Sequence, residues 1–418
     1  MRYNVVKYIP SIFACLACIF LIYGIESNVF KENRMAGDEE KFHIPTIVHF
    51  YEGKSAQNYP AAMTPGYHML SSLVYGYSGE SILSVRFFTS IITIIFVYLL
   101  SYVFYISTNY LGALMSLPAV TSLYIIPSGA WLLPDNISWL FVIGSLLLLL
   151  EGERNIKNSF ILSFLIMASV SVRQTNIWLI LPISSLFAYE AIYKEFNSRS
   201  LIRYFISVLP PILFLFYFVY IWGGLTPPNF QGEHTSFSPS SLPFFLSIFS
   251  LYSFVYIIPF LYGTHYRLSR LFKVFLNPGL FFGLFVSVIF KTNYSPSSGR
   301  VSGLWNVVDL FPTFFGRSTV ILVGSVIGSG IIYYVLNNIR RDFSTVLSTS
   351  IISFVAINAI NEYVYHRYFT GMLIIISSLI ILGFKRSNRY DFTPEFLQVI
   401  PILTFTLLNA IITYTKLL

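Results

Sequence analysis

Long hydrophobic runs separated by short polar stretches recur along the whole chain. About thirteen of them approach the length of a membrane-crossing helix, and they lack the polar-apolar alternation of barrel strands. Only helices and closed barrels satisfy their backbone hydrogen bonds in lipid. The pattern therefore predicts an all-α, polytopic integral membrane protein. The expected spans are 8–26, 81–105, 109–127, 132–150, 158–172, 175–193, 203–222, 242–263, 275–291, 318–337, 345–360, 368–384 and 396–415.

Composition agrees with this class and excludes a soluble fold. Hydrophobic residues make up 55% of the 418 positions and charged residues 11%, and the mean hydropathy is +0.69. Cys15 and Cys18 lie inside the first apolar run, where packing suits them better than a zinc site or a disulfide. We expect that run to be a retained helix, because no small-residue cleavage site follows it. We predict one transmembrane domain over residues 1–418.

The charges between the runs predict the orientation. Lysine and arginine concentrate on the side of the N-terminus, which by the positive-inside rule is cytoplasmic. These residues are Arg154, Lys157, Lys194, Arg199, Arg203, Arg267, Arg270, Lys273, Arg340, Arg341, Lys385, Arg386 and Arg389. The net charge of +8 is thus a consequence of topology, and we expect no nucleic-acid partner.

Most of the unusual polar residues emerge on the opposite, extracytoplasmic face. The longest polar stretch is the first external loop, about 27–80, where Asp38, Glu39 and Glu40 stand just before Phe42 and His43. In this loop Pro45 should begin a short interfacial helix that Gly53 ends, and the stretch to Tyr77 should be re-entrant or interfacial. The other candidates on this face are Asp135, Arg173, Gln174, Asn176, Glu233, His234, Glu362, His366 and Arg367.

Four motifs together resemble one known family. They are the acidic pair followed by Phe42-His43-Ile44-Pro45, then Tyr51-Glu52-Gly53-Lys54, Thr64-Pro65-Gly66 and Arg173-Gln174-Thr175-Asn176. In combination they are similar to the polyprenyl (dolichyl)-phosphate-glucose-dependent alpha-1,2-glucosyltransferases of the GT-C superfamily. The resemblance implies a multi-helix GT-C fold with the catalytic acid in the first external loop. It also implies transfer of glucose from a polyprenyl-phosphate donor to a lipid-linked glycan.

The chemistry of such a transfer assigns roles to the candidates. A carboxylate among Asp38, Glu39 and Glu40 would accept the proton of the acceptor hydroxyl, with inversion at the anomeric carbon. His43 would orient that base or contact phosphate. Arginine matches phosphate oxygens with a planar fork, so Arg173, Arg367 and the adjacent His366 would hold the leaving phosphate, with Gln174 and Asn176 beside the donor. We expect no metal and no other cofactor.

Departures from the family pattern leave the sugar and the acceptor open. The family's Gly-Asp-Lys-Ser-x-His is reduced here to Gly232-Glu233-His234, and its Asp-Asn-Arg-His-Tyr becomes Tyr365-His366-Arg367-Tyr368, with Glu362 upstream. Spacing does not choose among the three loop acids. A mannosyl- or other hexosyltransferase acting on a lipid or a protein is the alternative, and a transporter or lipid flippase is a more distant one.

Structural roles without chemistry remain for several of these residues. The acidic triplet suits a solvated loop, Arg173 and His366-Arg367 suit interfacial anchors, and Asp135 suits a helix N-cap. The length favours a prokaryotic cell membrane over the endoplasmic reticulum as the location.

Overall fold

The structure is a computed structural model that describes residues 37–108, 112–193, 197–231, 237–262, 273–274, 276–292, 303–361, 364–387 and 396–417, with scattered positions between 12 and 23. In the described part, six helices are long and apolar enough to cross a membrane, which agrees with a multi-pass helical membrane protein. The chain divides into two compact units. Unit 1 comprises Met1–Tyr102, Ser116–Gly232 and Thr406–Leu418; unit 2 comprises Val103–Met115 and Glu233–Phe405. That one transmembrane domain spans the chain stays a prediction.

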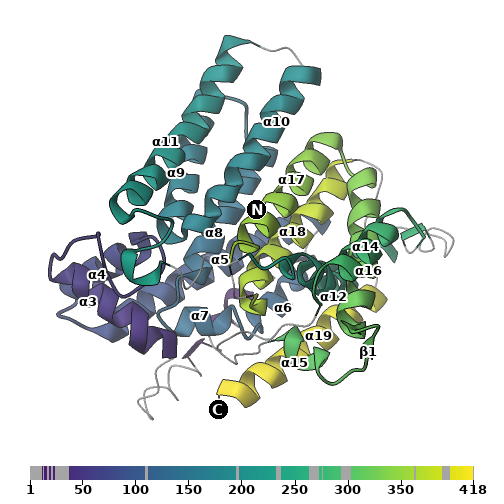
Figure 1. Cartoon of the computed structure of the whole chain (residues 1–418), viewed down its shortest axis with the longest axis horizontal. Helices are drawn as coiled ribbons and strands as arrows, with labels where there is room; N and C mark the ends of the chain where they lie inside the picture. Colours follow the sequence, from purple (N-terminus) through teal and green to yellow (C-terminus); the bar gives the residue numbers. More distant parts are fainter. Residues whose placement is uncertain are drawn as a thin grey trace, which may run out of the picture. The chain divides into compact units, whose positions relative to one another are not determined.

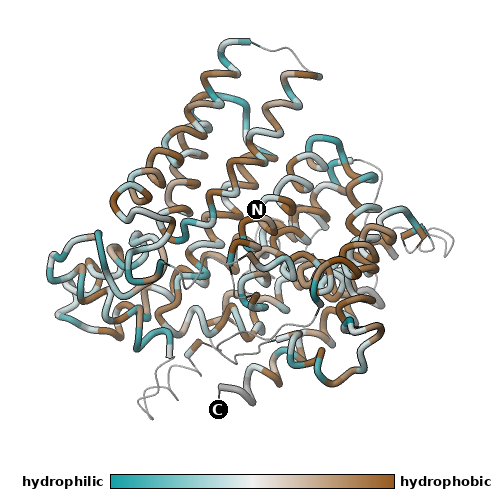
Figure 2. The backbone as a smooth tube through the Cα atoms, viewed as in Figure 1, coloured by the Kyte–Doolittle hydropathy of each residue, from teal (hydrophilic) through white to brown (hydrophobic). Residues whose placement is uncertain are grey.

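Unit 1 is built around helices that pack side by side (Figure 1). Its segments are η1 (Glu39–His43), α3 (Ile44–Tyr51), α4 (Gly66–Tyr77), most of α5 (Ile82–Thr108), α6 (Leu117–Val120), α7 (Ile126–Ala130), α8 (Asp135–Glu151), α9 (Ile156–Val172), η3 (Gln174–Leu179), α10 (Ile180–Tyr193), α11 (Ser198–Trp222), η4 (Pro228–Phe230) and the end of α19 (Phe396–Leu417). Helix α9 packs against both α8 and α11, and α3 packs against α4. Figure 2 shows hydrophobic residues along much of α9, α10 and α11, with hydrophilic residues near the start of α11.

Local sequence explains where these helices begin and end. The side chains of Asn155 and Asn197 accept hydrogen bonds from backbone N–H groups three residues on, and so cap α9 and α11. Helix α11 ends at Gly223, whose φ of 70° is left-handed. The predicted helix after Pro45 is confirmed as α3, with proline in its first turn.

Unit 2 holds most of the remaining segments. They are the end of α5, most of η2 (Gly112–Ser116), α12 (Ser241–Tyr262), α14 (Gly279–Ile289), α15 (Leu304–Val308), the paired strands β1 (Thr313–Phe314) and β2 (Arg317–Ser318), α16 (Thr319–Asn338), α17 (Arg341–Asn358), α18 (His366–Arg386) and the start of α19 as far as Phe405. Helix α12 packs closely on α16. A Cβ at Gly328 would lie 2.0 Å from the Leu246 carbonyl oxygen, so this approach requires a residue without a side chain.

One predicted span is wrong. Residues 109–127 do not form a single helix, because the described part consists of the short pieces η2, α6 and the start of α7. Pro118 and Pro127 lie in the first turns of α6 and α7, where proline is tolerated, and a longer helix through them would lose backbone hydrogen bonds.

The last helix supplies partners for this broken stretch. The side chains of Asn409 and Thr413 donate to the carbonyl oxygens of Pro118 and Thr121, at 3.4 and 2.9 Å. Buried carbonyl groups of a broken helix need such partners in a membrane. Within unit 1, Ala14, Cys18 and Ile22 of the first hydrophobic run pack beside this stretch, in a cluster with Val97, Val120 and Ile126. The packing role predicted for Cys18 is confirmed.

Candidate active site

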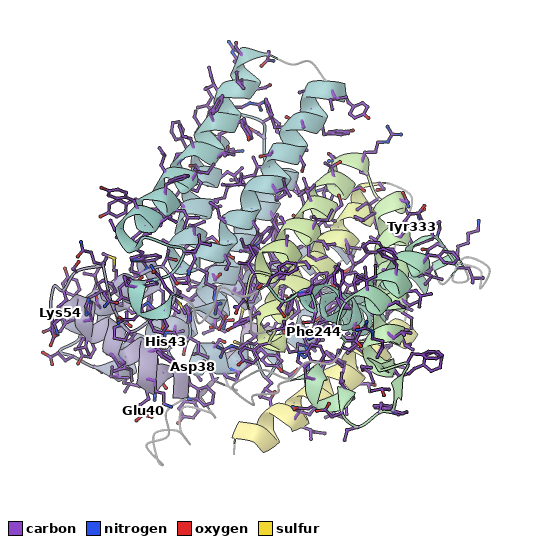
Figure 3. The ribbon with its side chains drawn as sticks, in the orientation of Figure 1. Asp38, Glu40, His43, Lys54, Phe244 and Tyr333 are labelled. Atoms are coloured by element: carbon purple, nitrogen blue, oxygen red, sulfur yellow. The ribbon has the colours of Figure 1, made fainter. Side chains whose placement is uncertain are left out.

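The three loop acids occupy different environments. Glu39 opens the π-helical turn η1 and is fully buried, whereas Asp38 is half-buried and Glu40 is exposed. Figure 3 labels Asp38, Glu40 and His43 at this end of unit 1. The carboxylate of Glu39 accepts a hydrogen bond from Nε of Arg86 in α5, at 2.9 Å, and the two side chains are 0% and 4% exposed. The triplet is therefore not a uniformly solvated loop.

His43 and His68 form a buried pair. Nδ1 of His43 lies 2.9 Å from Nε2 of His68, and the rings stack with centroids 5.2 Å apart. Burial, and secondarily the charge of His43, lowers the pKa of His68 well below its usual value of 6.5. Because only one of the two facing nitrogens can carry a proton in a neutral pair, His68 and His43 fix each other's tautomers.

A second ion pair joins two of the predicted candidates. The guanidinium of Arg173, at the C-terminal end of α9, donates through Nη2 to a carboxylate oxygen of Asp135. Asp135 is the first residue of α8, and the N-cap position belongs to Pro134 without a side-chain cap. The ion pair thus replaces the N-cap role that sequence left open for Asp135. The Arg173 side chain keeps 21% of its surface exposed.

Tyr67 contacts residues next to both ion pairs. It is fully buried, and its ring packs with Ile92, Ile137 and Val172 from α5, α8 and α9. Burial chiefly raises the pKa of Tyr67; hydrogen bonds with Thr89 and Ser71 lower it, and the charges of Glu39 and Asp135 raise it by a smaller amount. The ring of Tyr67 also lies edge-on to His43 of η1, with centroids 6.3 Å apart, so Tyr67 links the acid-bearing turn to the end of α9 in one polar cluster inside unit 1.

Two of the family-like motifs contact each other. The backbone N–H of Thr64 donates to Oε1 of Gln174 at 3.1 Å, and the Gln174 amide donates to the carbonyl of Ala62 at 2.9 Å. The Thr64 hydroxyl donates to the carbonyl of Val170 at 2.6 Å. A Cβ at Gly66 would lie 2.4 Å from Oγ of Ser171. The Thr64-Pro65-Gly66 turn is therefore fitted to the end of α9 and to η3.

Asn176 is buried and bonded to neighbouring helices. It is 3% exposed, and its amide donates to Oγ of Ser138 at 2.7 Å and to the carbonyl of Ser169 at 3.1 Å. Those bonds tie η3 to α8 and α9. Because its amide is bonded to protein groups, Asn176 acts by holding in place the segment that carries Arg173 and Gln174.

Two of the remaining candidates lie in unit 2. His366 and Arg367 begin α18 in unit 2, where Nδ1 of His366 accepts from the backbone N–H of Leu304 at 3.3 Å. The Arg367 guanidinium lies 5.4 Å from the ring centroid of Tyr368. Glu233, His234 and Glu362 lie outside the described residues.

Sequence reasoning missed Arg86, Tyr67 and His68. Arg86 is the most consequential omission, and a cation inside a predicted span is the signal that points to it. In the described ranges, no group of three or more His, Cys, Asp or Glu side chains is arranged to hold a metal ion. That the reaction needs no metal or other cofactor stays a prediction.

Comparisons with known proteins give little further guidance. No family model and no curated protein matches the chain. Among solved structures, the chain is similar to the crystal structure of ArnT from Cupriavidus metallidurans in the apo state. The identity is 10%, the match covers 84% of this chain and 73% of that chain, and the TM-score is 0.34. At these values we draw no functional conclusion from the likeness.

Proposed function

We propose that this chain is an inverting membrane glycosyltransferase that moves a hexose, with glucose as the first donor to test, from a polyprenyl-phosphate sugar to a hydroxyl of a lipid-linked glycan. The observation that carries the proposal is the polar cluster of unit 1. There His43 of the acid-bearing turn η1 lies edge-on to the Tyr67 ring, and Val172, which precedes the Arg173-Gln174-Thr175-Asn176 segment, packs in the same cluster, although His43 and Arg173 are 130 residues apart in sequence. A base and a phosphate-binding cation in one site are what the reaction requires.

The base is best assigned to Asp38. A proton acceptor must lie within hydrogen-bond reach of the acceptor hydroxyl. Glu39 is fully buried and engaged by Arg86, and Glu40 is exposed at the surface. Asp38 is half-buried next to this ion pair. We assign Glu39 and Arg86 to holding the turn that presents Asp38.

The transfer then needs one displacement. The hydroxyl oxygen forms a bond to the anomeric carbon, the bond from that carbon to the phosphate oxygen breaks, and the proton passes to Asp38. The lipid phosphate leaves with the electron pair and is stabilised by Arg173. Asp135 holds the guanidinium in place, and the Arg173 side chain keeps 21% of its surface exposed.

The position of the buried acids favours an enzyme over a transporter. In the described residues the buried carboxylates are Glu39 and Asp135, and both lie in the first turn of a helical segment. A transport path through the bilayer favours acids in the middle of helices. We place the reaction on the extracytoplasmic face because of the charge asymmetry of the loops.

A donor panel tests the reaction class and the sugar together. Purified protein would be given radiolabelled polyprenyl-phosphate glucose, mannose and other hexoses with a lipid-linked glycan acceptor. We expect transfer from the glucose donor. Transfer from mannose instead would support the alternative hexosyltransferase, and movement of lipid between leaflets without any transfer would overturn the proposal in favour of a flippase.

Amide substitutions test the base. Asp38→Asn should lower turnover by about 100-fold or more while donor binding persists, because the amide keeps the shape but accepts no proton. Glu40→Gln should have little effect, and Glu52→Gln, an exposed acid of the same loop, is the matched control. Near-normal turnover in Asp38→Asn would contradict its assignment as the base. Near-normal turnover in all three variants, Asp38→Asn, Glu39→Gln and Glu40→Gln, would show that none of these acids is the base and would refute the mechanism.

A charge-conserving series tests Arg173. A phosphate ligand should give activity in the order Arg, Lys, Ala, because lysine keeps the charge but loses the bidentate fork. Arg154 is the matched control, since it also pairs with an acid, Glu190, at 3.0 Å. Normal transfer per folded molecule in Arg173→Ala would exclude it as a donor ligand and move the role to His366 and Arg367.

A further inference from the structure

A short hairpin in unit 2 exposes large apolar side chains. Residues 310–318, here called the apolar hairpin, contain β1 and β2, which pair antiparallel (Figure 1). Leu310, Phe311, Phe314 and Phe315 are 79%, 53%, 58% and 90% exposed. Four large apolar residues within six positions form a surface that soluble loops avoid, and such surfaces mark an interaction site.

The turn of this hairpin carries an aromatic residue in a backbone conformation that aromatic residues disfavour. Phe315 and Gly316 both have positive φ, 48° and 71°. A two-residue turn of this kind favours asparagine or aspartate followed by glycine. A bulky side chain in the left-handed region is strained, and strain held at a particular position points to function. Phenylalanine is therefore present at the tip although it disfavours this backbone conformation and although its apolar side chain is 90% exposed.

The hairpin is fixed to the ends of two apolar helices. The guanidinium of Arg317 donates to the carbonyl oxygens of Val288 and Phe290, at 2.7 and 3.1 Å, where α14 ends. The next residue, Ser318, is the N-cap of α16. These bonds hold the hairpin between the two helix ends.

Its distance from the bilayer follows from this attachment. Helix α16 begins at Thr319 and is one of the candidate membrane spans. Phe315 precedes Thr319 by four residues, so at most about 14 Å of extended chain separates them. Each interfacial layer of a bilayer is roughly 5 to 8 Å thick. The tip thus lies within reach of the boundary between headgroups and acyl chains.

We propose that the apolar hairpin inserts Phe314 and Phe315 into the headgroup–acyl boundary of the membrane that α16 enters. The partner is the lipid surface, which covers apolar side chains and is continuous with the spanning surface of α16. The side chains at the tip offer no charge for a polar partner. Insertion would fix the depth of the α14 and α16 ends in the bilayer, a role separate from glycosyl transfer.

A fluorescent label placed beside the aromatic tip tests the proposal. In full-length protein with Cys15→Ala and Cys18→Ala, a bimane label would be attached at Leu310→Cys, which leaves all three phenylalanines in place. The protein would be held in nanodiscs of phosphatidylcholine and phosphatidylglycerol. Quenching would be measured with nitroxide-bearing lipids and with aqueous iodide.

Two labelled controls set the scale. Gln57→Cys lies in the exposed, polar first loop, and Phe216→Cys lies on the candidate span α11, 67% exposed. For the Leu310 label we expect at least half the lipid quenching seen at Phe216 and less than half the iodide quenching seen at Gln57. Iodide quenching equal to that at Gln57, without lipid quenching, would place the hairpin in water and overturn the proposal.

A second variant asks whether the aromatic tip carries the insertion. Phe315→Asn should preserve the hairpin, because asparagine suits this turn. With the label at Leu310, it should reduce lipid quenching by about twofold or more. Unchanged lipid quenching would show that the tip does not hold the hairpin in the membrane, and the proposal would be wrong.

Discussion

The buried ion pair between Glu39 and Arg86 gives the sharpest quantitative test of the site. Arg86→Met removes the cation from a pair whose side chains are 4% and 0% exposed. Breaking a buried pair by removing one partner leaves an uncompensated charge and costs about 3 to 5 kcal/mol. Glu39→Gln should cost a similar amount, because it strands the guanidinium. The double variant removes both charges and should recover to within about 1 kcal/mol of the parent, or exceed it.

The assay is equilibrium unfolding in mixed micelles, followed by tryptophan fluorescence, on the parent, both single variants and the double variant. Non-additivity isolates the interaction between the two residues. Lys54→Met is the matched control, because Lys54 pairs with Glu52 at the surface with side chains 59% and 46% exposed. An exposed pair contributes at most about 1 kcal/mol.

Activity measured on the same four proteins shows whether Glu39 and Arg86 position the turn or take part in the reaction. If Glu39 and Arg86 position the turn that presents Asp38, the double variant should regain stability and part of the turnover. The reasoning is refuted if Arg86→Met costs no more than Lys54→Met. It is also refuted if the double variant is as unstable as the two single variants added together.

Two further predictions concern packing and pH. Gly66→Ala should destabilise unit 1 by about 1 to 3 kcal/mol and lower activity, since its Cβ would lie 2.4 Å from Oγ of Ser171; Gly144→Ala in α8, whose Cβ meets only ordinary contacts, should be neutral or stabilising in the same unfolding assay. The pKa of His68 in the folded protein lies well below its usual value of 6.5. Below pH 6.5, therefore, the unfolded chain binds a proton at this histidine and the folded chain does not. The free energy of unfolding should then fall as pH falls, by up to about 1.4 kcal/mol per pH unit. In His68→Gln this part of the slope should disappear, and an identical pH profile would contradict the buried neutral histidine.

Hydrophobic runs predicted the helices well where the run ends at a clear signal. The predicted span 203–222 corresponds to α11, which ends at Trp222 just before a left-handed glycine. The predicted span 318–337 corresponds to α16, where Ser318 supplies the cap. The span 109–127 failed because apolar composition alone takes no account of Pro118 within it and Pro127 at its end, each of which lies in the first turn of a new short helix.

The candidate site was only partly predictable, for a reason of distance along the chain. The acids, His43 and Arg173 stand out locally because charges are rare in this sequence. Which residue pairs with which does not stand out, since Arg86 is 47 residues from Glu39 and Asp135 is 38 residues from Arg173. His68 lies in a weakly apolar stretch without any local pattern, and only the folded arrangement brings it to His43.

The bonds from α19 to the broken stretch of unit 1 have a consequence for biosynthesis. Thr413 and Thr121 are 292 residues apart, and at typical translation speeds roughly 15 to 60 s pass between their syntheses. Throughout that interval the carbonyl groups of residues 118–121 lack the partners that the finished protein gives them. During synthesis these carbonyl groups of unit 1 must therefore be hydrogen-bonded by insertion machinery or lipid headgroups until α19 has been released from the ribosome.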